Sequence, residues 1–82
     1  MLPRIKTIQT DEDYTLRVTF DDGKSVIYDV KDDMESIKTY AVLREEHGLF
    51  EQARLDESRT CVYWNDEIDL ASDCIYEYGT AA

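Results

Sequence analysis

Strict alternation of apolar and polar side chains over residues 14–20 is the feature that most constrains this fold. Every second position is apolar: Tyr14, Leu16, Val18 and Phe20. A period of two residues predicts a β-strand with one buried face. The pair Asp22-Gly23 follows, and its glycine supplies the positive φ that a hairpin turn needs. Residues 25–30 therefore predict the antiparallel partner strand, with Val26, Tyr28 and Val30 on the same buried face.

The rest of the chain predicts a mixture of strands and short helices. Met34, Ile37 and Tyr40 recur at helical spacing, in a segment that begins at residues 32–33 and ends at residues 47–48. Further strands are expected at residues 4–9, 53–56, 60–64 and 68–70, and a last helix at residues 72–78. The prediction is an α+β domain in the order β-β-β-α-β-β-α. We expect an antiparallel sheet of about five strands with two or three short helices packed on one face.

The length of 82 residues favours one domain over residues 1–82, without linkers or internal repeats. We expect residues 79–82 to form a frayed tail, because they are small and follow the predicted end of the last helix.

Acidic side chains outnumber basic ones, 19 to 9, which gives a net charge of −10. Proteins that bind nucleic acids or anionic membranes need a basic surface, so we expect neither activity. No apolar run approaches the ~20 residues that cross a bilayer, and no signal peptide is evident. The two cysteines, Cys61 and Cys74, are isolated in the sequence. We therefore expect a cytoplasmic protein with reduced, mostly buried thiols.

We find no motif for a metal, a cofactor or catalysis, and we expect none of the three. The acid clusters at residues 11–13 and 21–23 lack the spacing of a calcium-binding loop and lie at predicted turns. Asp69 and Ser72 precede the last helix, where either can cap the first turn, so we assign both a structural role. A rival hypothesis is a small enzyme that uses Asp69, Tyr76 or His47. It requires two of these side chains within hydrogen-bonding distance in one cleft.

Four motifs, in this order and spacing, carry a family resemblance: Pro3-Arg4-Ile5, Tyr14-x-Leu16-x-Val18-x-Phe20-x-Asp22-Gly23, Tyr28-Asp29-Val30 and Trp64-x-x-x-Ile68-Asp69-Leu70-x-x-Asp73-x-Ile75-Tyr76. The chain resembles a bacterial family catalogued as domain of unknown function 2442. The resemblance implies a small α+β fold and no assigned activity. It also implies a protein partner, because some relatives are encoded beside another small protein and are suspected antitoxins. Many relatives have Pro and Gly in the turn after the tryptophan, where this chain has residues 65–67.

Negative charge is concentrated late in the chain, since five acids and no Lys or Arg follow Arg59. One interpretation is an acidic patch that meets a basic partner, formed by Asp66, Glu67, Asp73 and Glu77. The alternative, which we favour, is that this charge serves solubility alone.

The outer face of the predicted sheet also carries apolar side chains. The face has four notable members: Arg17, Ile27, Cys61 and Tyr63. Such a patch marks a site for a partner or for self-association, unless a loop or a terminus covers it.

These features together predict a non-enzymatic protein-interaction module of antitoxin-like character. Its partner is a second protein or another copy of the chain. The alternatives are the small enzyme and a regulatory domain that senses a small ligand. A ligand-sensing domain requires an apolar pocket of about 300 Å³ or more.

Overall fold

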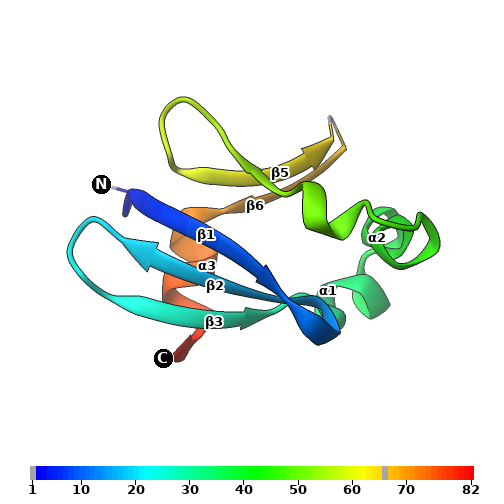
Figure 1. The fold of residues 1–82 in the computed structure, drawn as a ribbon, viewed down its shortest axis with the longest axis horizontal. Coiled ribbons are helices and arrows are strands. Elements are labelled where there is room, and N and C mark those ends of the chain that lie inside the picture. The colour runs from blue at the N-terminus through cyan, green and yellow to red at the C-terminus, as the bar shows by residue number, and fades with distance from the viewer. Residues whose placement is uncertain (1, 66) are drawn as a thin grey trace.

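The computed structural model describes residues 2–65 and 67–82 and contains two antiparallel sheets (Figure 1). The first sheet has the order β1-β2-β3-β7, with strands β1 (Ile5–Asp11), β2 (Thr15–Phe20), β3 (Ser25–Asp29) and β7 (Thr80–Ala81). The second has the order β4-β5-β6, with strands β4 (Arg54–Leu55), β5 (Cys61–Asn65) and β6 (Ile68–Ala71).

Short helices connect and cover these sheets. The α-helices are α1 (Lys31–Ser36), α2 (Val42–Glu45) and α3 (Ser72–Tyr78), and the 3-10 helices are η1 (Glu12–Tyr14), η2 (Lys38–Ala41) and η3 (Phe50–Gln52). The prediction of an α+β fold is therefore confirmed. None of the helices in the described part of the chain has the length and apolar character that a membrane crossing requires.

The hairpin of β2 and β3 has the predicted buried face. Leu16 lies opposite Tyr28 and Val18 lies opposite Val26, and all four side chains are buried. Gly23 has a φ of +91°, which is the left-handed turn conformation that the Asp-Gly pair predicts.

Tyr14 is an exception to the predicted alternation. Its φ is 59° and that of Asp13 is 64°, so both residues lie outside the extended region. The corner between β1 and β2 turns at these two residues, and β2 begins at Thr15. The Tyr14 side chain is half-buried and packs edge-on against Phe50, with the ring centroids 5.3 Å apart.

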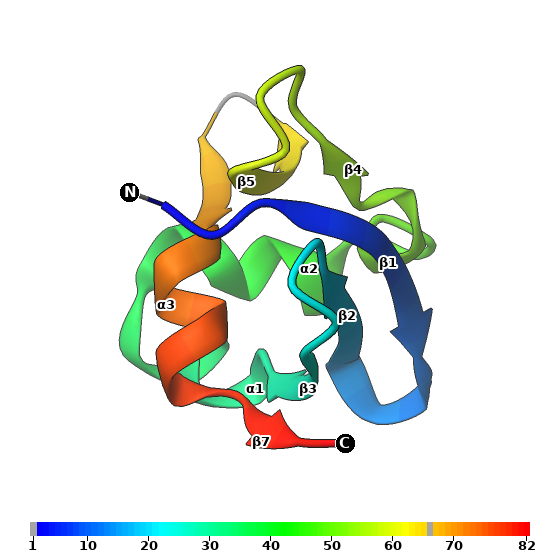
Figure 2. The same ribbon diagram turned by 90° about the vertical axis from the view of Figure 1, so that its left-hand side faces the viewer.

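The prediction of one sheet of about five strands is corrected to two sheets of four and three strands. The N–H of Ile5 donates to the carbonyl of Arg59 at 2.8 Å, and this bond joins β1 to the turn between β4 and β5. The sheets do not continue into one another along the rest of β1. Helix α3 contacts both β3 and β6, so the helices do not all cover one face of a single sheet (Figure 2).

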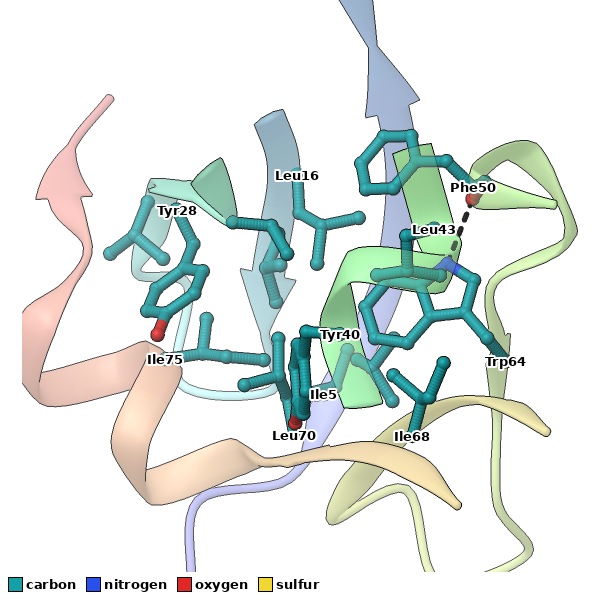
Figure 3. Packing of buried hydrophobic residues seen from close by; sticks show 14 of the residues in the cluster. Ile5, Leu16, Tyr28, Tyr40, Leu43, Phe50, Trp64, Ile68, Leu70 and Ile75 are labelled. Atoms are coloured by element: carbon teal, nitrogen blue, oxygen red, sulfur yellow. Dashed lines mark hydrogen bonds between the residues drawn. The ribbon is translucent and has the colours of Figure 1, made fainter. Parts of the chain in front are cut away.

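The core lies between the two sheets. The segment that links β3 to β4, residues 30–53, contributes Leu43 and Phe50 to it (Figure 3). Both side chains are buried there together with apolar residues of both sheets. The two sheets therefore pack as separate layers around a shared core. Trp64 Nε1 donates to the backbone carbonyl of Phe50 at 2.9 Å, so the indole is a core anchor as well as a hydrogen-bond donor. Ile37, predicted to face the core, is 43% exposed.

Two tyrosine hydroxyls are satisfied inside this core. Tyr28 donates to Asp33 Oδ2 at 2.7 Å, and burial together with this carboxylate raises the pKa of Tyr28. Tyr40 donates to the backbone carbonyl of Asp69 in β6. Burial, with the charges of Asp33 and Asp69, raises the pKa of Tyr40 to about 12.

The predicted frayed tail is an ordered strand. Ala81 lies opposite Val26 and Thr80 opposite Ile27, and the N–H of Ala82 donates to the carbonyl of Ser25 at 3.0 Å. Gly79 permits this pairing, because a Cβ there would lie 2.9 Å from the Val26 side chain and 2.7 Å from the carbonyl of Ile75. The free edge of β3 supplies the partners that the sequence does not reveal.

Asp69 and Ser72 do not cap α3. The residue before the helix is Ala71, which makes no side-chain cap, and in the first turn the Asp73 carboxylate accepts from the N–H of Cys74 at 2.9 Å. Asp69 lies within β6 with its side chain exposed, and the buried Ser72 hydroxyl has no hydrogen-bond partner among residues 2–65 and 67–82. The N–H of Ser72 donates to the carbonyl of Thr60 at 2.9 Å, so the sheet satisfies the amide that a cap would have served.

Candidate functional site

The predicted acidic patch is not one surface in the described structure. Asp73 and Glu77 lie one helical turn apart on α3 and are exposed. Glu67 is exposed before β6, at the end of that strand remote from α3. Asp66 lies outside the described residues. The structure therefore separates the patch into a helical pair and a residue beyond the far end of β6.

The predicted sheet face is divided between the two sheets. Arg17 and Ile27 lie directly opposite each other on β2 and β3, whereas Cys61 and Tyr63 belong to β5 in the other sheet. Arg17 is exposed and its Nε lies 3.4 Å from Asp11 Oδ2, and the other three side chains are half-buried. Burial raises the pKa of the Cys61 thiol above its usual range, so the thiolate is disfavoured.

The three residues of the enzyme hypothesis lie apart. Asp69 is on β6, Tyr76 is on α3 with its hydroxyl bound to Asp22, and His47 is exposed beyond α2. Tyr76 and His47 line two different hollows among the described residues, and Asp69 lines neither of these. The arrangement therefore lacks the pair that the hypothesis requires.

A hollow of about 540 Å³ between the β1–β2 corner and the segment from α2 to η3 concentrates negative charge. Five carboxylates line it: Asp11, Glu12, Asp13, Glu46 and Glu51. Arg44 and His47 also line the hollow. We call this site the acidic hollow.

Two of the five carboxylates already have cationic partners. Asp11 lies against Arg17, and Lys31 Nζ lies 3.0 Å from Asp13 Oδ2. Among the described residues, no ion pair involves Glu12, Glu46 or Glu51. These three exposed carboxylates give the rim an uncompensated negative charge.

The floor of the acidic hollow is apolar. Tyr14, Leu43 and Phe50 line it, and Phe50 is stacked on Trp64 with the ring centroids 5.9 Å apart. Leu43 and Phe50 are 1% and 3% exposed, so the half-buried Tyr14 supplies the accessible apolar surface, while the rim attracts a cation. The floor side chains come from the core, so the packing of the domain fixes their positions.

Lys31 holds the corner that forms one wall. Its ammonium donates to the backbone carbonyl of Asp13 at 2.6 Å and to the Asp13 carboxylate, and it also pairs with Asp29 at 3.2 Å. These contacts raise the pKa of Lys31, which keeps the ammonium charged. The corner is thereby kept in its left-handed conformation, which costs about 1–2 kcal/mol for a residue with a side chain.

Comparison with known proteins gives a family for this chain. The family model for the protein of unknown function DUF2442 matches residues 5–81. The chain belongs to the DUF2442 family. Comparison of this DUF2442 chain with curated proteins and with solved structures found no match in either.

Sequence reasoning on this DUF2442 chain considered an acidic patch only in the C-terminal third, where it favoured a role in solubility, and missed the acidic hollow. The hollow combines residues 11–14 with residues 43–51, which are separated by a whole hairpin and α1. The acid cluster at residues 11–13 belongs to the hollow, but the sequence analysis explained it as a turn. Only the return of the chain after α2 brings Glu46 and Glu51 beside it.

Proposed function

We propose that the protein is a non-enzymatic interaction module that binds a basic protein partner in the cytoplasm. The acidic hollow is the observation that carries this proposal. Complementary charge accelerates and orients the encounter of two proteins, and a central apolar contact stabilises the complex. The rim and floor of the acidic hollow offer both kinds of contact to one partner segment.

The proposed partner is a small protein encoded beside this one, which the antitoxin-like resemblance suggests. A partner of this kind presents a Lys- or Arg-rich surface with an apolar side chain at its centre. The apolar side chain packs on Tyr14, which the buried Phe50 supports, and its cationic neighbours face Glu12, Glu46 and Glu51.

Co-expression of the adjacent open reading frame with the tagged chain, followed by affinity capture, tests the proposal. We expect a stable complex that weakens at high salt, because exposed charge pairs are screened. Failure to recover any complex with the neighbouring protein would overturn the antitoxin-like role.

Two triple variants with the same change in net charge locate the contact. One changes Glu12, Glu46 and Glu51 to Gln, and the other changes Glu35, Glu57 and Glu77 to Gln. We expect the first to reduce capture strongly and the second to leave capture close to that of the wild type. Equal losses would show that net charge alone, rather than the acidic hollow, attracts the partner.

A further inference from the structure

A second hollow, of about 740 Å³, lies where the N-terminal segment, the β2–β3 turn and α3 meet. Its apolar surface comes from four side chains: Leu2, Pro3, Phe20 and the ring of Tyr76. Phe20 and Tyr76 pack edge-to-face with their centroids 4.8 Å apart, so the aromatic wall is fixed by the core. The volume exceeds the ~300 Å³ of a small-ligand pocket.

The two carboxylates in this hollow are already engaged. Asp21 accepts two hydrogen bonds from the Arg59 guanidinium, both at 2.9 Å. Asp22 accepts a hydrogen bond from the Tyr76 hydroxyl at 2.7 Å and another from the N–H of Lys24. These contacts hold the pKa of Asp22 below its usual range, so it stays ionised and bound to its partners.

The hollow also has a positively charged side chain that none of these pairings neutralises. Arg4 lines the hollow and is exposed, and it forms no ion pair among the described residues. The Lys24 ammonium lies 3.9 Å from the centroid of the Tyr76 ring. In a chain of net charge −10, this hollow is lined by an exposed arginine that has no acidic partner among the described residues.

We propose that this hollow binds a small carboxylic acid with an aromatic or aliphatic body. The body packs on Leu2, Pro3 and the Tyr76 ring, which the buried Phe20 supports from behind, and the carboxylate accepts hydrogen bonds from the Arg4 guanidinium. A planar guanidinium matches a carboxylate with two parallel hydrogen bonds, which is why arginine serves such sites. This proposal does not depend on the protein partner, because the acidic hollow is formed by different elements.

Titration with 3-phenylpropionate, followed by amide chemical shifts in ¹⁵N–¹H NMR spectra of the full chain, tests the proposal. A ligand of this size binds a shallow site at about 1–10 mM. We expect shifts confined to residues around Phe20, Asp22 and Tyr76. The neutral analogue 3-phenylpropanamide has the same body without the charge, and we expect it to bind about tenfold more weakly.

Two charge-matched variants complete the test. Arg4→Gln is expected to weaken phenylpropionate about tenfold and to leave the binding of phenylpropanamide unchanged. Arg54→Gln removes an exposed arginine of β4 that lines neither hollow and is expected to leave both affinities unchanged. The spectrum of each free variant shows whether it is folded. Equal binding of acid and amide, equal effects of the two variants, or no shifts around Phe20 and Tyr76 would each overturn the proposal.

Discussion

At the scale of single residues, Arg59 connects three parts of the molecule. Its carbonyl accepts the Ile5 N–H, its guanidinium donates to the Ile5 carbonyl at 3.3 Å, and the same group holds Asp21. The residue does this with a φ of 60°, where a glycine would be unstrained. The contacts of the side chain therefore oppose a backbone penalty.

Substituting Arg59 separates these two effects. Arg59→Ala loses the side-chain contacts and keeps the strained backbone, so we expect a loss of about 1 kcal/mol in the free energy of unfolding. Arg59→Gly loses the same contacts but relieves the strain, so it should be about 1 kcal/mol more stable than the alanine variant. Urea denaturation of both variants measures the difference. Equal stability would show that the left-handed backbone carries no penalty here.

Asp69 gives a contrasting expectation. Its exposed carboxylate accepts no side-chain hydrogen bond among the described residues, so Asp69→Ala should change the free energy of unfolding by less than about 0.5 kcal/mol. Asp56→Ala is the matched control, because Asp56 accepts hydrogen bonds from the N–H groups of Thr60 and Cys61. We expect only the control to lower the melting temperature. A clear loss in Asp69→Ala would restore the capping role.

At the scale of elements, the docking of α3 and β7 depends on how closely the chain passes Val26. A Cβ at Gly79 would clash with backbone and with a β-branched side chain, neither of which moves easily. We expect Gly79→Ala to cost about 2 kcal/mol or more, by strain in the packed segment. Gly48→Ala is the control, since its Cβ meets nothing within 4 Å and only its φ of +82° is strained. Thermal melting of the two variants separates the cost of the clash from the cost of a left-handed backbone, and a Gly79→Ala variant that melts with the wild type would exclude the steric explanation.

The hydroxyl of Tyr40 joins η2 to β6. Ionisation of this hydroxyl is expected to lower the stability of the fold at alkaline pH. Because the folded protein raises its pKa from 10.0 to about 12, the stabilisation is fully present below pH 10 and is lost as pH rises through about 12. Tyr40→Phe should cost about 1 kcal/mol at pH 7. It should also show a shallower loss between pH 10 and 12, although Tyr28 still contributes there. Denaturation curves across this range provide the measurement, and parallel pH profiles would contradict the assignment.

Some elements of this fold are predictable from the sequence and others are not. The β2–β3 hairpin and α3 were predictable, because alternation, an Asp-Gly turn and a terminal glycine are local signals. The division into two sheets was not, since it depends on packing between segments that are far apart in sequence. The acidic hollow and β7 likewise arise from pairings between distant segments. Counting charges along the sequence reveals neither the acidic hollow nor β7.

At the scale of the whole molecule, the two hollows lie towards opposite ends. The β2–β3 turn and the β4–β5 turn lie at one end of the long axis, and η1 and α2 lie at the other (Figure 1). The molecule measures 34 × 24 × 20 Å, so ligands of the two sites need not compete for space. A protein partner and a small acid can therefore occupy the molecule together.

The net charge of −10 also acts on the molecule as a whole. Like charges on a domain of this size repel one another, and the four ion pairs described above offset few of them. We expect the melting temperature to rise by a few degrees between about 10 mM and about 500 mM NaCl, since salt screens this repulsion. Calorimetry over that range checks the sign. A melting temperature that falls would mean that the ion pairs outweigh the repulsion.

The single main-chain hydrogen bond between the sheets, among the residues that the structure describes, has a consequence for following the protein in solution. The Ile5 amide breaks its bond to Arg59 whenever the sheets part, whether or not either sheet melts. Amides in the middle of β2 and β5 break theirs only when a sheet itself comes apart. Solvent deuterium taken up at Ile5 therefore reports the opening of the interface separately from global unfolding.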